Sequence, residues 1–238
     1  TCAGQQRNTP LPVHTAQDPY ILKTGLYRLF PRSAAESCLP VSGCVRQRAY
    51  LEQVILIYSV KENVLMSAKE NNPVALITGS AHRIGACIAR HLHQQNYRVI
   101  IHYHSSAETA QRLVDELNQL RADSADLQKA NLSEPAEIEQ LSQQSIKCFG
   151  QLDVLVNNAG VFYPGELLNE EEGKLESMIN TNLYSAYHLT RIIAPTMVSK
   201  RNGHIFNICA VASIVAYPNG GSYSISKFAL LGFSKVLI

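Results

Sequence analysis

A long hydrophobic run is missing from this sequence of 238 residues. The longest apolar run near the N-terminus, Val54 to Tyr58, is far shorter than the roughly 20 residues of a membrane-spanning helix, so no membrane span is expected. An excess of charge is also missing, because 21 Lys and Arg are balanced by 19 Asp and Glu to a net charge of +2. This balance gives no support to nucleic acid or an anionic membrane as a partner.

Paired cysteines are missing as well, because the six cysteines form no Cys-x-x-Cys pair and show no even spacing. Three of them lie in apolar segments, which favours reduced packing residues over a disulfide framework. A reducing, cytoplasmic setting is therefore the simplest expectation. The proportions of 46% hydrophobic and 17% charged residues are ordinary for a globular protein, and the length allows one α/β domain with a sizeable core.

Residues 1–65 differ from the rest of the chain. They hold five of the ten prolines and show no sustained period of 3.6 or 2. Three interpretations are open: a disordered extension, a targeting peptide without clean arginine-rich amphipathicity, or translated sequence upstream of a start at Met66. We favour the third, assign no function to this leader, and expect the folded domain at 66–238.

The stretch 72–92 organises the remainder. An apolar run at 74–77 predicts a strand, and apolar residues with helical spacing follow from 84 to 92. Between them, Gly79 allows a tight turn and Gly85 lets the backbone come close to a phosphate. A strand, a glycine loop and a helix N-terminus in this order are typical of a site for a dinucleotide pyrophosphate.

The end of the second strand, Arg98 to Tyr103, bears on the choice of dinucleotide. An NAD site carries a carboxylate about 20 residues past the glycine loop, to accept a hydrogen bond from the ribose 2′-hydroxyl. Here the residues are His102-Tyr103-His104-Ser105-Ser106, with no carboxylate before Glu108. Hydroxyls, imidazoles and Arg83 would instead hold a 2′-phosphate, so the sequence favours NADP(H). Two alternatives are open. His102 and His104 could simply lie at an exposed strand end, or they could be a pair of metal ligands, for which no third ligand is evident.

Further strands alternate with amphipathic helices. Helical spacing at 110–120 and 138–146 is followed each time by a short apolar run, and a third strand is expected at 125–130. This alternation predicts a Rossmann-type α/β fold, a doubly wound parallel sheet with right-handed crossovers. Ser133 is expected to cap the helix that starts near Pro135. Ligands of such sheets lie beyond the carboxyl ends of the strands, where the glycine loop and the turn 157–160 fall.

Tyr223 and Lys227 lie four residues apart and share one face of a predicted helix. A free tyrosine has a pKa near 10, and a nearby ammonium favours its phenolate. Tyr223 is therefore a candidate general acid in a reduction, with Lys227 tuning it. The alternative is an exposed amphipathic helix with a surface lysine.

The combination of TGSAHRIG at 78–85, NNAG at 157–160 and YSISK at 223–227 resembles the short-chain dehydrogenase/reductase family over about residues 72–238. The resemblance implies a nicotinamide cofactor and hydride transfer to or from a carbonyl or imine carbon. The first half, with Arg83 and HYHSSAETA, resembles the pteridine reductases, in which the arginine and the HYH-type strand end serve NADPH. The later half, 204–235, is more similar to sepiapterin-reductase-like and 3-oxoacyl reductase members.

The resemblance also implies roles for individual residues. Lys227 would hold the nicotinamide ribose, and Asn182 would support a water relay to this lysine, which makes Tyr223, Lys227 and Asn182 the expected catalytic residues. Asn131 stands where the family usually has an aspartate beside the adenine, and the turn 158–160 would line the adenine-ribose side. The expected cofactor-binding residues are Gly79, Ser80, Arg83, Ile84, Gly85, His102, His104, Ser105, Asn131, Asn158, Ala159, Gly160, Tyr223 and Lys227.

Two features depart from the family pattern. The substrate-orienting serine lies thirteen residues before the tyrosine, where this sequence has Ala210, and losing one such donor typically costs ~10²–10³ in rate. Ser213 could substitute for this serine or could only cap a loop. The sequence also stops at Ile238, inside the helix of Tyr223, so we expect a sheet truncated at its C-terminus with an unpaired edge beside its fifth strand.

Together these features predict an NADPH-dependent short-chain reductase of a small-molecule substrate. A pterin is the favoured substrate, and a 3-oxoacyl or other small carbonyl compound is the alternative. The rival from another class is a catalytically impaired NADP-binding protein. We expect no metal site, and a homodimer or homotetramer if the domain is complete.

Overall fold

The computed structural model describes residues 23–26, 55–61, 72–216 and 218–237. Within these residues, seven strands form one sheet in the order β1-β2-β7-β6-β3-β4-β5. The last five strands of this order pair in parallel, which confirms the predicted Rossmann-type α/β fold. Their bounds are β3 Val74–Ile77, β4 Arg98–Tyr103, β5 Ala125–Lys129, β6 Val154–Asn157 and β7 Asn202–Ile208.

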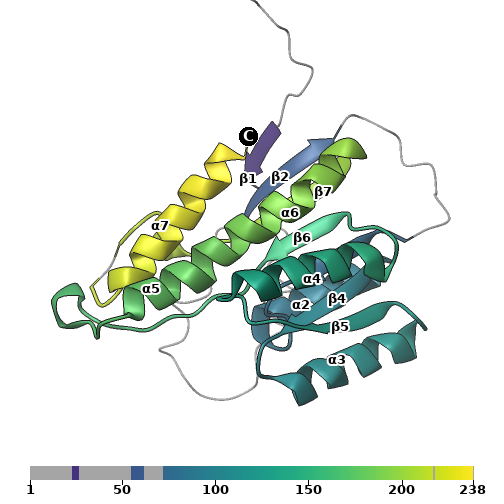
Figure 1. Ribbon diagram of the computed structural model, residues 1–238, viewed down its shortest axis with the longest axis horizontal. Helices are drawn as coiled ribbons and strands as arrows, with labels where there is room; N and C mark the ends of the chain where they lie inside the picture. The colour runs from purple at the N-terminus through teal and green to yellow at the C-terminus, as the bar shows by residue number, and fades with distance from the viewer. Residues whose placement is uncertain (1–22, 27–54, 62–71, 217, 238) are drawn as a thin grey trace, which may run out of the picture.

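Helices cover both faces of this sheet, which explains why its central strands are continuous apolar runs (Figure 1). α2 (Arg83–Gln94) and α3 (Ala107–Leu120) pack on one face, and α4 (Pro135–Cys148) and α6 (Ser185–Ser199) pack on the other. α7 (Gly221–Val236) lies beside α6 and shares a small apolar cluster with it. No helix in the described part of the chain is long and apolar enough to cross a membrane.

The edge of β7 is paired, so the expectation of an unpaired edge there is wrong. β2 (Ile55–Lys61) runs antiparallel to β7 from the pair Ile55 and Ile208 to the pair Lys61 and Asn202, and β1 (Lys23–Leu26) pairs antiparallel with β2. Two segments of the expected leader are therefore part of the sheet. The rest of residues 1–65 lies outside the described residues, where the interpretation as a leader stays a prediction.

Short helical segments connect these elements. η2 (Leu167–Asn169) and α5 (Lys174–Ile179) follow β6, and η4 (Val211–Ser213) follows β7. Between α5 and α6 the helical path continues through a π-helical turn, η3 (Asn180–Tyr184). The expected cap at Ser133 is wrong by one residue, because Glu134 occupies the N-cap position of α4, with Pro135 as the first helical residue.

Candidate active site

The glycine loop between β3 and α2 is built as the sequence predicts. Gly79 has a φ of 61°, in the left-handed region that favours glycine. A Cβ at Gly85 would lie only 2.6 Å from the Gly79 carbonyl oxygen and 2.7 Å from the Ser80 Cα, so only glycine lets α2 pack against the loop. The first turn of α2 contains no acidic residue, which leaves the positive end of its dipole available to an anion. The loop therefore fits a dinucleotide pyrophosphate.

Thr78 and Asn158 tie this loop to the turn after β6. The Thr78 hydroxyl oxygen accepts hydrogen bonds from the backbone N–H groups of Asn158 and Ala159, at 2.9 and 3.0 Å. The Asn158 amide donates in turn to the carbonyl oxygens of Thr78 and Gly79, at 2.8 and 3.1 Å. The structure thus brings together two motifs that are about 80 residues apart, and Asn158 acts on the loop itself.

His102 has a different position from the expected one. It is only 2% exposed, and its Nδ1 accepts a hydrogen bond of 2.9 Å from the backbone N–H of Gly79. Its Nε2 therefore carries the proton and donates to the Ala130 carbonyl oxygen at 3.1 Å. Burial lowers the pKa of this imidazole to about 4, so the ring is neutral near pH 7. The expectation that His102 itself contacts a 2′-phosphate is not supported, because the ring is enclosed and both nitrogens are engaged by the backbone.

The other residues proposed for the 2′-phosphate lie at the surface. His104 and Ser105 are exposed just past the carboxyl end of β4, and Arg83 is exposed where the glycine loop enters α2. Arg83 has a φ of 53°, an unfavourable conformation for a residue with a side chain. Such strain persists only where the surroundings enforce it, and it is common at ligand sites. Arg83, His104 and Ser105 therefore offer an exposed guanidinium, an imidazole and a hydroxyl to a ligand at this edge of the sheet.

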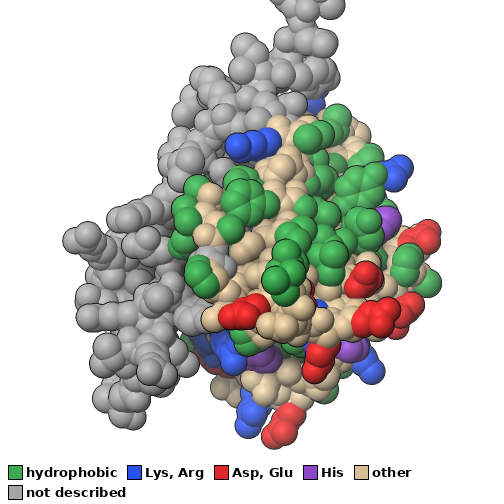
Figure 2. Space-filling model, turned by 90° about the vertical axis from the view of Figure 1, so that its left-hand side faces the viewer, with side chains coloured by type: hydrophobic (Ala, Val, Ile, Leu, Met, Phe, Trp, Pro, Cys, Tyr) green, Lys and Arg blue, Asp and Glu red, His purple; other side chains and the backbone are tan. Residues whose placement is uncertain are grey.

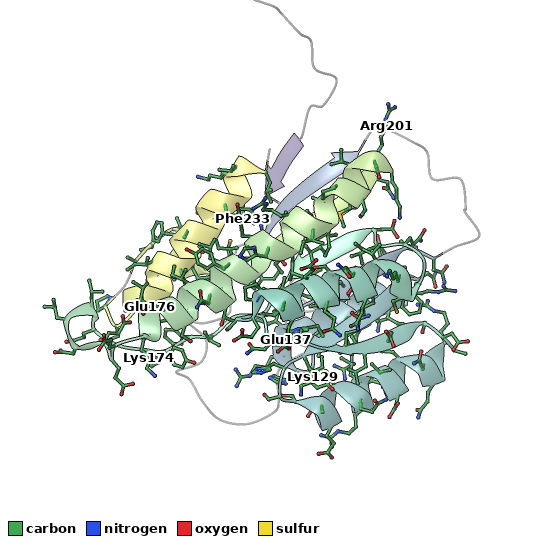
Figure 3. The ribbon with its side chains drawn as sticks, in the orientation of Figure 1. Lys129, Glu137, Lys174, Glu176, Arg201 and Phe233 are labelled. Carbon is green, nitrogen blue, oxygen red and sulfur yellow. The ribbon has the colours of Figure 1, made fainter. Side chains whose placement is uncertain are left out.

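Asn131 lies past the carboxyl end of β5, beside the start of α4. Its backbone N–H donates to a carboxylate oxygen of Glu137 at 2.6 Å, and its side-chain oxygen accepts from the Ser133 N–H at 3.1 Å. Figure 3 shows Glu137 and Lys129 at this end of the sheet. The side-chain carbonyl of Asn131 thus already accepts a hydrogen bond within a local turn. Its side-chain amide nitrogen is the group that could face an adenine.

Tyr223 and Lys227 occupy the first two turns of α7. Lys227 is 5% exposed, and its Nζ donates to the Ile208 carbonyl oxygen at 2.9 Å. The Nζ also lies 5.9 Å from the centroid of the Tyr223 ring. Burial lowers the pKa of Lys227 to about 8, and the nearby Cys209 opposes this effect. The alternative of a surface lysine is therefore wrong. A half-buried tyrosine next to an enclosed ammonium is suited to proton transfer.

Asn182 meets this pair from the π-helical turn. Its side-chain oxygen accepts from the Val161 N–H at 2.8 Å, and its amide donates to the Ser226 hydroxyl at 2.9 Å. A Cβ at Gly160 would lie 3.1 Å from the Asn182 oxygen and 3.6 Å from the Lys227 Nζ. Asn182, Gly160 and Lys227 therefore lie around one small space, and Asn182 fixes the turn of α7 between Tyr223 and Lys227. A water relay through it stays a prediction.

Ser213 does not take the place of the missing serine. It is fully buried, and its hydroxyl accepts a hydrogen bond of 3.1 Å from the Ala210 N–H. This contact caps η4, which is the structural role considered above. Ala210 itself is partly exposed at the end of β7. Among the described residues, no group of three or more His, Cys, Asp or Glu side chains could hold a metal ion.

Comparison with known proteins decides the family. The family model described as short chain dehydrogenase matches residues 73–238. The chain belongs to the short-chain dehydrogenase family. The glycine loop, the turn at Asn158 and the pair of Tyr223 and Lys227 all lie within the matched residues.

Several curated relatives of this short-chain dehydrogenase carry one name. A 3-oxoacyl-[acyl-carrier-protein] reductase of Staphylococcus aureus is 33% identical over 161 residues, 68% of this chain and 65% of the relative. A 3-oxoacyl-[acyl-carrier-protein] reductase of Synechocystis is 30% identical over 164 residues, 69% of this chain and 66% of the relative. Nodulation protein G of Rhizobium meliloti is 36% identical over 163 residues, 68% of this chain and 64% of the relative. The chain spans slightly less than two thirds of the length of these relatives.

Sequence reasoning missed several residues that build this site. Thr78 joins the two turns, and the Phe162 ring lies edge-on to the Tyr223 ring at a centroid distance of 4.7 Å. Glu170 contacts the N-terminus of α7. The family motifs include Thr78 and could have indicated it. Glu170 belongs to no motif, and only the folded chain brings it and Phe162 to α7.

Proposed function

We propose that this chain is an NADPH-dependent reductase that acts on the ketone of a 3-oxoacyl thioester. The observation that carries the proposal is the buried Lys227 ammonium 5.9 Å from the Tyr223 ring centroid, beside the turn at Gly160. The names of the relatives indicate the substrate class. A pterin is no longer the favoured substrate, because only the motifs of the glycine loop and strand end resemble the pteridine reductases.

The reaction needs one proton donor and one hydride donor. The hydride to the ketone carbon would come from NADPH held at the glycine loop between Gly79 and Gly85. Tyr223 gives its phenolic proton to the ketone oxygen as the electron pair of the C=O bond moves onto that oxygen, and an alcohol results. Lys227 stabilises the phenolate that remains, because its ammonium is held in place by the Ile208 carbonyl in a site of low dielectric constant. Asn182 and Ser226 fix the helix turn that carries both groups.

The proposed preference for NADPH depends on exposed groups near the end of β4. Arg83 can pair with a phosphate in a bidentate manner, and His104 and Ser105 can donate to the same phosphate. No carboxylate lies between His102 and Glu108 to accept from a free 2′-hydroxyl. His102 contributes indirectly, because it holds the glycine loop to the end of β4.

The test is turnover of the 3-oxobutanoyl thioester of coenzyme A, followed by loss of NADPH absorbance, beside a dihydropterin and a simple ketone. We expect the thioester to be the best of the three substrates. Tyr223→Phe should lower turnover by about 10²–10⁴-fold and leave NADPH affinity unchanged, because a general acid contributes that much. Faster turnover of the pterin would contradict the proposed substrate, and an active Tyr223→Phe variant would contradict the mechanism.

A second candidate function is NADP binding with impaired turnover. It is favoured by Ala210 at the serine position and by the burial of Ser213, which leaves neither residue able to donate to the ketone oxygen. Binding of NADPH without turnover of any substrate in the panel would support this candidate. If Ala210→Ser then raises turnover at least tenfold, the position is that of a substrate-orienting donor and the reductase site is intact.

Self-association into a homodimer or homotetramer remains a proposal. Figure 2 shows hydrophobic side chains gathered on one face of the molecule. Large exposed apolar side chains on α7 and η2 include Ile225, Phe228 and Leu168, the last being 94% exposed. Exposed apolar residues that gather in this way are typical of a protein interface and support the proposal.

A further inference from the structure

The N-terminus of α7 is held by a carboxylate from another part of the chain. Glu170, between η2 and α5, accepts a hydrogen bond of 3.0 Å from the Ser222 backbone N–H through one oxygen. Its other oxygen accepts from the Ser222 hydroxyl. Ser222 is 1% exposed and directly precedes Tyr223. One side chain therefore accepts from both hydrogen-bond donors of the residue next to the proposed general acid.

The backbone around this contact is shaped to admit the carboxylate. A Cβ at Gly221 would lie 2.5 Å from a Glu170 carboxylate oxygen, so the position has no room for a side chain while Glu170 is in place. A Cβ at Gly165 would lie 3.2 Å from the Glu170 Cγ. Gly165 also forms a parallel bridge with Gly220, just before α7. Two glycines thus flank the carboxylate where it approaches the helix.

The charge of Glu170 suits this place. The first N–H groups of a helix have no partner within the helix, and the helix dipole makes this end positive. α7 has no acidic residue in its own first turn, whereas α3 and α4 carry Glu108 and Glu137 there. Hydrogen bonds from a backbone N–H to an ionised carboxylate are roughly twice as strong as neutral ones. Glu170 therefore supplies, from outside the helix, the negative charge that the first turn of α7 lacks.

The next turn of α7 is fixed by different groups. Asn182 donates to Ser226, and Lys227 donates to the Ile208 carbonyl oxygen. Tyr223 lies between these contacts and the contact of Glu170 with Ser222. The position of its phenol relative to Lys227 thus depends on both ends of this short segment.

We propose that Glu170 is a positioning residue for Tyr223, which sets the phenol at the distance from Lys227 and the substrate that proton transfer needs. This inference rests on the proposed reductase function. Glu170 acts on the phenol through its two contacts with Ser222. A misplacement of about 1 Å at a reacting group can cost on the order of 10²-fold in rate. The contact of Glu170 with Ser222 can therefore control turnover although it does not involve the reacting group itself.

The test compares Glu170→Ala, Glu170→Gln and the neighbouring Glu171→Ala. We expect Glu170→Ala to lower kcat by about 10- to 100-fold with little change in the Kd for NADPH. Glu170→Gln keeps an oxygen that accepts from the Ser222 N–H, so it should recover most of this loss. Glu171 is 80% exposed and forms an ion pair with Lys174 at the surface, so its removal should leave kcat unchanged. A Glu170→Ala variant with at least half the wild-type kcat would overturn the proposal.

Amide hydrogen exchange gives a second measurement that needs no turnover. Peptides covering 219–226 should exchange at least tenfold faster in Glu170→Ala than in the wild type or Glu171→Ala, because the Ser222 N–H loses its acceptor. An unchanged exchange rate would refute the proposal that Glu170 holds the N-terminus of α7, even if kcat fell. Faster exchange with unchanged kcat would show a purely structural contact and would refute the positioning role. If the wild-type chain turns over no carbonyl substrate, the proposed function fails, while exchange still decides whether Glu170 holds α7.

Discussion

The buried imidazole of His102 should make stability depend on pH in a way that one substitution can isolate. The folded His102 has a pKa of about 4, against 6.5 for the group outside the fold. A difference of this size corresponds to about 3 kcal/mol. Between these two values the unfolded chain binds a proton that the folded chain does not bind. The contribution of His102 is therefore fully present above pH 6.5 and is lost as the pH falls toward 4.

The structure gives the reason for this sign. Nδ1 can accept from the Gly79 N–H only while it is unprotonated, and Nε2 already donates to Ala130. A proton on Nδ1 would place two donors against each other at 2.9 Å in a site without water access. Protonation therefore releases the glycine loop, and cofactor affinity should fall together with stability.

The assay is urea unfolding at a series of pH values for the wild type and His102→Gln, whose amide can accept and donate but does not titrate in this range. The free energy of unfolding of the wild type should fall by roughly 2–3 kcal/mol more than that of the variant between pH 7 and pH 4.5. His104→Gln is the control and should retain most of the wild-type dependence, because His104 is exposed. Parallel curves for the wild type and His102→Gln would refute the assignment of the buried neutral ring.

Three further predictions concern the same site. Gly85→Ala should abolish measurable NADPH binding and destabilise the fold by about 1–3 kcal/mol through overpacking. The control Gly232→Ala, whose Cβ would meet nothing within 4 Å, should be neutral or stabilising. Equal effects of the two substitutions would contradict the close packing of α2 against the glycine loop. Lys227→Met should lose at least about 10²-fold in kcat. Between pH 8 and 10.5 the wild type should also gain up to about 3 kcal/mol in stability relative to this variant, because the pKa of Lys227 falls from 10.5 to about 8 on folding. A constant difference in the free energy of unfolding across this pH range would show that Lys227 is not buried. NADPH should bind at least about tenfold more tightly than NADH, and Arg83→Ala should reduce this ratio through loss of a charged pair to phosphate; equal dissociation constants in a titration of the wild type would refute the 2′-phosphate site.

Local patterns predicted the part of the fold that local forces determine. The strand bounds 74–77 and 98–103 agree with β3 and β4, because strands buried on both faces are continuous apolar runs between polar turns. The glycine loop could also be predicted, because the turn requires a positive φ at Gly79 and the helix approaches the loop too closely at Gly85 for a side chain. The strand β2 was not predicted, because it pairs with β7 at a sequence separation of well over 100 residues. Nothing in its own pattern indicates a partner so far along the chain.

Burial of polar groups was the main source of error within the site. His102 was expected to face a ligand, because it lies in the stretch where an NAD site carries a carboxylate. Its partners Gly79 and Ala130 are 23 and 28 residues away, and only the crossover geometry brings them to the ring. Ser222 and Glu170 are separated by 52 residues. Such contacts follow from the sheet order and helix packing, which no short window of sequence contains.

The π-helical turn at Asn180–Tyr184 explains one further property of this chain. A π turn contains one residue more than an α turn, so the faces of α5 and α6 are offset by about 100° from those of one regular helix. The segment before the turn can then present its side chains to α7, while the segment after it packs into the core of the sheet. Removing one residue here would restore a regular helix and rotate one of these faces away from its partner. We therefore expect a deletion of one residue within 180–184 to cost one of these two contacts, and no one helical period describes residues 174–199.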